Sequence, residues 1–172
     1  MWEVGSLKLE INTTFYNFAL LKNVILILFL FVGNGDKITN ITKANETKIL
    51  AENAYNSKKY DEAIKNYIYL IDSLNYEDPK ALLNLAHAYY LTDDSTNSIQ
   101  TYNSLLTTSD NTVKSIAHQQ LGVISEKNND LKSAATHFKN ALKANPKNKE
   151  ARFNYELVKK KMEDQKENQD KK

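Results

Sequence analysis

Three segments of this 172-residue sequence share one design: YDEAIKNYIYLI (residues 60–71), STNSIQTYNSLL (95–106) and LKSAATHFKNAL (131–142). Each segment has a small residue that is followed four positions later by an aromatic residue. The three pairs are Ala63 and Tyr67, Ser98 and Tyr102, and Ala134 and Phe138. The small residue recurs after 35 and then 36 positions, so the chain contains an internal repeat.

A second motif lies upstream of each of these segments. Its three copies are ILAENAY (49–55), NLAHAYY (84–90) and QLGVISE (120–126). Short polar joins rich in Asp, Asn, Lys and Ser separate the two motifs of each unit, as expected for turns between helices. Glycine and proline are scarce, which disfavours an all-β fold with its many turns. The pattern therefore predicts helix–turn–helix units and an all-α fold.

These units resemble the tetratricopeptide repeat (TPR), whose pattern is W-x2-L-G-x2-Y, then A-x3-F, then A and P. The third copy is the most similar: Leu121 and Gly122 occupy the L-G pair, while His118 stands in the place of the Trp. The second half of its pattern is matched by Ala134, Phe138, Ala141 and Pro146. The resemblance implies a right-handed superhelical stack of about three repeats, at residues 44–78, 79–114 and 115–148.

The repeat pattern also predicts which residues pack between helices. Small residues let two helices approach closely, and the aromatic residues then fill the space between one unit and the next. The predicted packing residues are Leu50, Ala51, Ala63, Tyr67, Leu85, Ala86, Tyr89, Ser98, Tyr102, Leu121, Gly122, Ala134, Phe138, Ala141 and Pro146.

The composition limits the kinds of function. The net charge of +2 gives no concentrated basic face, so we expect no nucleic-acid partner. The absence of cysteine excludes disulfides, thiolate metal sites and cysteine nucleophiles. His87, His118 and His137 are separated in the sequence and show no metal-ligand spacing, and no glycine-rich phosphate loop occurs. We therefore expect no enzyme activity, cofactor or metal.

The remaining candidate site is the groove that stacked repeats line with their first helices, a surface that binds peptides or proteins. By position in the repeat, the candidate groove residues are Lys48, Glu52, Tyr55, Lys80, Asn84, His87, Tyr90, Gln119, Gln120 and Val123. Tyr55 and Tyr90 are candidate aromatic anchors.

The resemblance allows these groove residues to be compared with one known groove of the family. That groove is a clamp in which Lys, Asn and Arg side chains hold the two carboxylates of chaperone C-termini. Lys48 and Asn84 match two of its positions, but Glu52 replaces an Asn, and Ile116 and Gln120 replace the last two basic residues. Because a carboxylate at Glu52 repels an anionic ligand, a chaperone-type clamp is not favoured. The sequence predicts a scaffold for protein contacts, with a cytoplasmic or membrane-anchored co-chaperone-like adaptor as the alternative.

The N-terminal region, residues 1–36, contains a short hydrophobic stretch. Lys22 precedes nine consecutive apolar residues, Val24 to Val32, and small residues follow. This order is typical of a secretory signal peptide, and the run is about half of the ~18 residues that span a bilayer. We expect export, to the periplasm if the protein is bacterial, with an uncleaved membrane anchor or a buried helix as alternatives.

The C-terminal region predicts a cap. Ala151, Tyr155, Val158 and Met162 lie on one helix face, and polar residues cover the other, so residues 149–164 are expected to form a capping helix. Residues 165–172 are expected to be disordered. The ending NPKNKEARFNYELVKK also resembles small exported repeat proteins of Bacteroidetes aerotolerance-type operons, which implies an adaptor in a multi-protein assembly.

Overall fold

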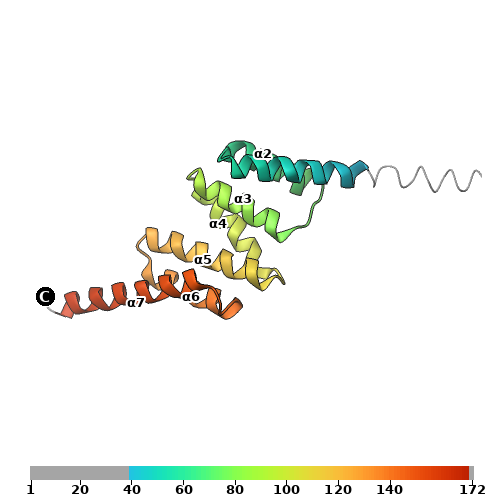
Figure 1. Cartoon of the computed structure of the whole chain (residues 1–172). Coiled ribbons are helices and arrows are strands. Elements are labelled where there is room, and N and C mark those ends of the chain that lie inside the picture. The colour runs from blue at the N-terminus through green and yellow to red at the C-terminus, as the bar shows by residue number, and fades with distance from the viewer. Residues whose placement is uncertain (1–38, 171–172) are drawn as a thin grey trace, which may run out of the picture. The chain divides into compact units, whose positions relative to one another are not determined.

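The computed structural model describes residues 39–170, and all regular structure in this range is helical (Figure 1). The chain divides into two units, residues 1–45 and 46–172. The first described helix covers residues 39–56, and its part from residue 46 onward belongs to the second unit. The other elements are α2 (Tyr60–Ile68), the π-helical turn η1 (Tyr69–Ser73), α3 (Pro79–Leu91), α4 (Ser95–Ser104), the 3₁₀ turn η2 (Leu105–Thr107), α5 (Asn111–Lys127), α6 (Leu131–Ala144) and α7 (Lys149–Asp170).

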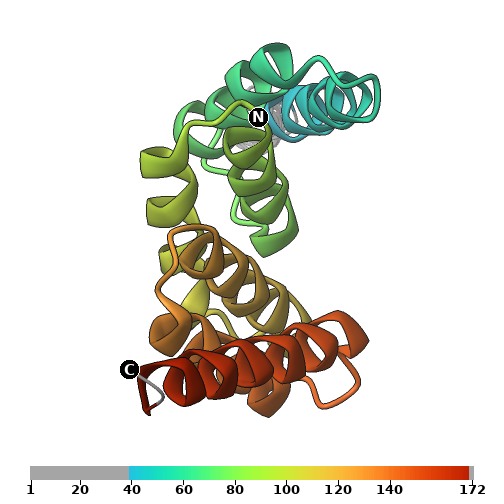
Figure 2. The same cartoon turned by 90° about the vertical axis from the view of Figure 1, so that its left-hand side faces the viewer.

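Successive helices pack against one another in chain order. The helix α2 contacts α3, α3 contacts α4, α4 contacts α5, and α5 contacts α6, which in turn contacts α7. The first helices of the later pairs also meet, since α3 contacts α5 and α5 contacts α7 (Figure 2). The fold is an all-α stack of helix pairs closed by a final helix, as the repeat pattern predicted.

Aspartates start four of the helices. Asp78, Asp94, Asp110 and Asp130 precede α3, α4, α5 and α6, and each side chain accepts a hydrogen bond from a backbone N–H of the first turn. A carboxylate there satisfies an otherwise unpaired donor and interacts favourably with the helix dipole. Pro79 occupies the first turn of α3, where its missing N–H costs nothing. Local sequence therefore fixes where these helices begin.

The core consists of small residues and the aromatics that face them. The side chains of Tyr67, Tyr102 and Phe138 are fully buried, each with the small residue four positions before it. Also buried are Ala51, Leu85, Ala86, Leu121, Gly122 and Ala141. Gly122 shows how closely α5 and α6 approach, because a Cβ there would lie 2.6 Å from Cε1 of Phe138.

Three of the predicted packing residues are less enclosed than the pattern suggested. Leu50 is 57% exposed. The equivalent Leu121 packs with Tyr102 and Leu105 of the preceding pair, and within residues 39–170 no helix pair precedes the first. Pro146 lies exposed in the turn between α6 and α7, so it shapes the turn rather than the core. Tyr89 is half-buried.

The final helix is longer than predicted. It runs from Lys149 to Asp170, so most of the segment expected to be disordered, 165–172, continues the helix as far as Asp170. Val158 is fully buried against Phe138, Met162 packs beside it, and Lys161 pairs with Glu126 of α5 at 2.6 Å. Residues of good helix propensity, mainly Lys, Glu and Gln, then extend the helix beyond this packed part.

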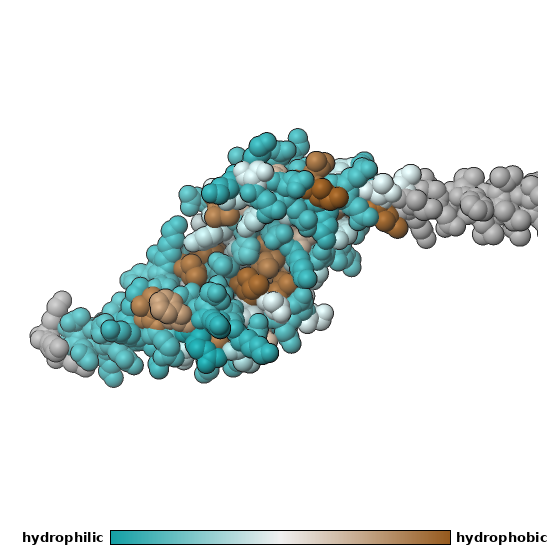
Figure 3. Space-filling model, viewed as in Figure 1, coloured by the Kyte–Doolittle hydropathy of each residue, from teal (hydrophilic) through white to brown (hydrophobic). Residues whose placement is uncertain are grey.

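The surface of the described residues is mostly hydrophilic, with separate apolar patches on the face that Figure 3 shows. Phe153 and Leu157 of α7 are 69% and 37% exposed, so both residues contribute apolar surface outside the core. No helix within residues 39–170 is both long enough and apolar enough to cross a membrane. The segment predicted to direct export or anchoring, residues 1–36, lies outside the described residues.

Candidate functional site

The candidate groove residues lie on the first helices of the three pairs. Glu52 and Tyr55 are half-buried on the helix 39–56, and most of the others are half-buried on α3 and α5. Lys80 is exposed in the first turn of α3. The half-buried residues of α3 and α5 are Asn84, His87, Tyr90, Gln119, Gln120 and Val123. Partner binding by these residues stays a prediction.

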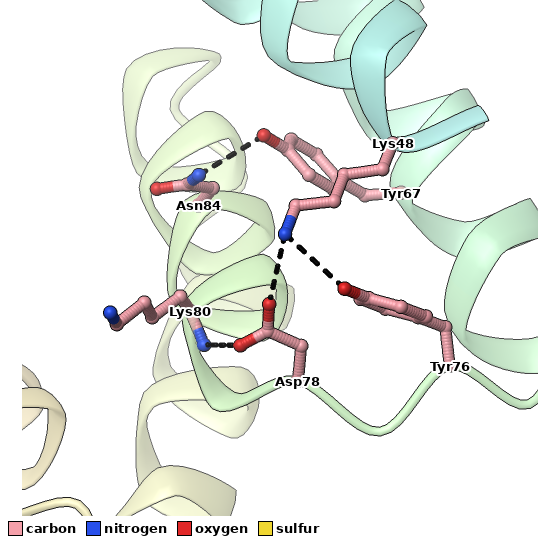
Figure 4. Close-up of polar contacts among 6 residues, drawn as sticks. All are labelled: Lys48, Tyr67, Tyr76, Asp78, Lys80 and Asn84. Carbon is pink, nitrogen blue, oxygen red and sulfur yellow. Dashed lines mark hydrogen bonds and ion pairs between the residues drawn. The ribbon is translucent and has the colours of Figure 1, made fainter. Parts of the chain in front are cut away.

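Lys48 joins the first helix pair to the second (Figure 4). Its ammonium donates to the hydroxyl of Tyr76 at 3.2 Å and to Oδ2 of Asp78 at 3.3 Å. These hydrogen bonds, the one to Tyr76 first, hold the pKa of Lys48 above its ordinary value. The other oxygen of Asp78 accepts from the backbone N–H of Lys80 at 2.8 Å and so caps α3. The charge of Lys48 is thus used within the chain.

Asn84 has an internal partner as well (Figure 4). Its side-chain amide donates to the hydroxyl of Tyr67 at 3.1 Å, which joins α3 to the buried aromatic residue of the preceding pair. The two residues that match the carboxylate clamp, Lys48 and Asn84, therefore both hold neighbouring repeats together.

One edge-to-face ring contact lies within the first helix pair, and another lies within the second. The rings of Tyr55 and Tyr60 stand edge to face at 5.7 Å between centroids, and those of His87 and Tyr102 at 5.6 Å. Burial lowers the pKa of His87, so its ring is uncharged at neutral pH. Of these four residues, Tyr55 and His87 lie on first helices and can present rings without a net charge to a partner.

The third pair continues this uncharged surface. Gln119 and Gln120 are half-buried on α5, and Val123 packs at the edge of the core that contains Phe138. Lys127 stands near the C-terminal end of α5, with its ammonium 6.0 Å from the centroid of the Tyr90 ring. Amide groups and rings can therefore provide most of the contacts on this surface of α3 and α5.

Two histidines that the sequence separates lie together in the structure. Nδ1 of His118 on α5 is 3.3 Å from Nδ1 of His137 on α6, and the ring centroids are 5.6 Å apart. The interpretation of these histidines as isolated was therefore wrong. His118 occupies the Trp position of the repeat, but the repeat pattern does not show that His137 faces it. Among residues 39–170, no group of three or more His, Asp or Glu side chains is arranged to hold a metal.

Comparison with known proteins identifies the repeat. A family model described as tetratricopeptide repeat matches residues 50–112 and 121–155. No curated protein is similar enough in sequence to count as a relative.

Solved structures similar to this chain include the Arabidopsis OM64 TPR domain, which is 25% identical, with a TM-score of 0.61 over 70% of this chain and 98% of that domain. The TPR2AB domain of yeast Sti1, in a pHSP90 complex, is 21% identical, with a TM-score of 0.64 over 73% of this chain and 49% of that one. The first TPR of Spaghetti (RPAP3), bound to the HSP90 peptide SRMEEVD, is 22% identical, with a TM-score of 0.60 over 70% of this chain and 94% of that one.

Proposed function

We propose that this chain, which belongs to the tetratricopeptide repeat family, is a non-catalytic scaffold that binds a segment of a partner protein. The observation that carries the proposal is the row of half-buried, mostly uncharged side chains along α3 and α5. Glu52 and Tyr55, which lie on the helix 39–56, extend this row into the first pair. Two of the similar structures are complexes with HSP90 ligands, which supports peptide binding as the use of such a stack.

The charges on this surface disfavour an acidic ligand. The ammonium of Lys48 already pairs with Asp78, and Glu52 lies one helical turn away on the same helix. An anionic peptide would have to break that pair and approach the carboxylate of Glu52. We therefore infer a partner segment that is apolar or neutral and polar, held by Tyr55, Tyr90 and the amides of α3 and α5.

A peptide titration separates this scaffold from the co-chaperone-like alternative, which the similarity to HSP90-bound domains favours. The labelled peptide SRMEEVD would be titrated with the full chain and followed by fluorescence anisotropy. We expect no saturable binding. Saturable binding that Lys48→Ala abolishes would establish the alternative, a chaperone adaptor.

Site-specific photo-crosslinking in the native cell tests where the partner lies. A photoreactive residue at Gln120 on α5 probes the groove, one at exposed Phe153 probes the cap, and one at exposed Gln100 on α4 is the matched control. We expect one protein to be captured from Gln120 and not from Gln100. Capture from Phe153 alone would place the interface on α7 instead and contradict binding by the groove.

Export or membrane association through residues 1–36 is part of the proposal. The run from Val24 to Val32 after Lys22 supports it, because this order is typical of a signal peptide. Fractionation followed by mass spectrometry of the mature N-terminus tests it. Recovery of the unprocessed chain in the cytosol would contradict export and anchoring alike.

A further inference from the structure

The histidine pair of the third repeat has a geometry that fits a metal ion. Zinc bound by histidine has Zn–N distances of about 2.0–2.1 Å, and a tetrahedral angle at the metal then puts two ligand nitrogens about 3.3–3.4 Å apart. The Nδ1 atoms of His118 and His137 are 3.3 Å apart. We propose that these two side chains form a two-histidine binding site for one Zn²⁺ or a similar nitrogen-preferring transition-metal ion.

The helices hold the two ligands in place. The hydroxyl of Ser115, three residues before His118, donates to the carbonyl of Ala141, four residues after His137, at 2.8 Å. On the other side of the pair, Gly122 of α5 lies directly against the buried ring of Phe138 of α6. Because contacts on both sides fix α5 against α6, little ordering of the backbone is needed when a metal binds.

Coordination needs neutral imidazoles. Burial lowers the pKa of both rings and so favours the neutral form. Without metal, Nδ1–H of one ring donates to Nδ1 of the other. When metal binds, that proton leaves Nδ1 and the ring takes up a proton at Nε2 through solvent, so both Nδ1 lone pairs reach the metal and the net proton count is unchanged.

The ligand atoms and their surroundings determine which metal ions suit this site. Both rings are half-buried, and His137 borders a hollow that Lys132, Ser133 and Thr136 also line, so water can approach the pair from the side of His137. Lys114 acts on His118 and lowers its pKa, whereas Asp130 acts on His137 and raises its pKa. Because both ligands are imidazole nitrogens, oxygen-preferring Mg²⁺ and Ca²⁺ are disfavoured, and Zn²⁺, Cu²⁺ or Ni²⁺ is preferred. This site does not depend on the proposed groove function.

Calorimetric titration of the full chain with Zn²⁺ alone at pH 7.5 tests the site. The variants are His118→Ala and His137→Ala, with Lys139→Gln on the exposed face of α6 as the control outside the pair, and circular dichroism checks that each is folded. We expect one Zn²⁺ per chain, at least tenfold weaker binding in each pair variant, unchanged binding in the control, and no binding of Mg²⁺.

A second readout keeps the test decisive if either alanine variant fails to fold. Zn²⁺ should raise the melting temperature of the unmodified chain, because an ion that binds only the folded state stabilises it, and the conservative variant His137→Gln should remove that rise. If Zn²⁺ neither binds the unmodified chain nor raises its melting temperature, or binds all variants equally, the pair is an imidazole–imidazole hydrogen bond only and the proposal is wrong.

Discussion

The joint between the first and second repeats differs in kind from the joint between the third repeat and α7. At the first joint, Lys48 pairs with Asp78, and their side chains are 32% and 21% exposed. At the second joint, Asn148 donates to Ser115 at 3.0 Å, and these two residues are 8% and 0% exposed. Beside them, Phe138 and Val158 are fully buried.

The two joints contribute unequally to the stability of the stack. Water can solvate the charges at the first joint if the pair is broken, so the pair contributes little to the free energy of unfolding. Water cannot reach the groups at the second joint, so a broken contact there leaves a buried polar group unpaired or a cavity unfilled. A polar contact at the second joint therefore contributes more to stability than one at the first.

The largest effect should come from Phe138→Ala. Its fully buried ring fills the space between α5, α6 and α7, and its loss should lower the free energy of unfolding by about 3–5 kcal/mol. Chemical denaturation followed by circular dichroism measures this. The matched control is Phe153→Ala on the exposed face of α7, which should change stability by less than about 0.5 kcal/mol. Equal effects of the two variants would mean that the repeat register is wrong.

Asn148→Ala should have the next largest effect. The side chain of Asn148 accepts from the backbone N–H of Ala151 at 2.9 Å, which caps α7, and its amide also donates to Ser115. Its loss should cost about 1–3 kcal/mol, because both partners are buried. Asn145 lies in the same turn and accepts from the exposed N–H of Lys147, so Asn145→Ala is the control and should cost much less. A smaller effect at position 148 than at 145 would contradict the difference between the two joints.

The third repeat should also be sensitive to acid. The pKa values of His118 and His137 lie below the ordinary value of 6.5 in the folded chain, mainly because of burial. At a pH above 6.5 both rings are neutral in the folded and unfolded states, and stability is complete. As the pH falls below that value, the histidines take up protons more readily in the unfolded chain than in the folded chain. The free energy of unfolding therefore decreases until the pH reaches the lowered pKa values of the folded chain.

Melting temperatures at pH 7.5 and 5.5, measured with a metal chelator present, test this dependence. The melting temperature should be lower at pH 5.5 in the unmodified chain, and the decrease should be smaller in the double variant His118→Gln, His137→Gln. A decrease of the same size in the double variant would assign the acid sensitivity to other groups, such as the half-buried His87, whose pKa is also lowered by burial.

The stack can be predicted from the sequence because the residues that pack between helices set the period of the repeat. The partners of polar side chains cannot be predicted in this way. Ala63, Ser98 and Ala134 recur with the spacing of the units, and each lies in the core. Leu50 matched the same pattern and is exposed, because its partner would be a preceding pair that residues 39–170 do not contain. Exposure of a repeat position thus depends on its place in the stack as well as on its residue type.

Side-chain pairing across helices depends on the exact approach of two helices, which a repeat pattern does not specify. Lys48 reaches Asp78 over 30 positions, and His118 reaches His137 over 19. The sequence placed Lys48 and Asn84 in a groove, but the structure also uses both to join repeats. Candidate residues of this kind are found from the sequence, and their internal partners are found from the structure.

The smallest effect should come from Lys48→Met, which keeps the aliphatic stem and removes the ammonium. Since the side chains of Lys48 and Asp78 are both accessible to water, the loss should be no more than about 1 kcal/mol. Asp78→Ala should cost more, because it also removes the cap of α3. A double-mutant cycle of the two variants isolates the pair, and its coupling energy should be below about 1 kcal/mol. A coupling energy as large as the loss in Asn148→Ala would show that the exposed joint stabilises the stack as strongly as the buried one, and the difference between them would not hold.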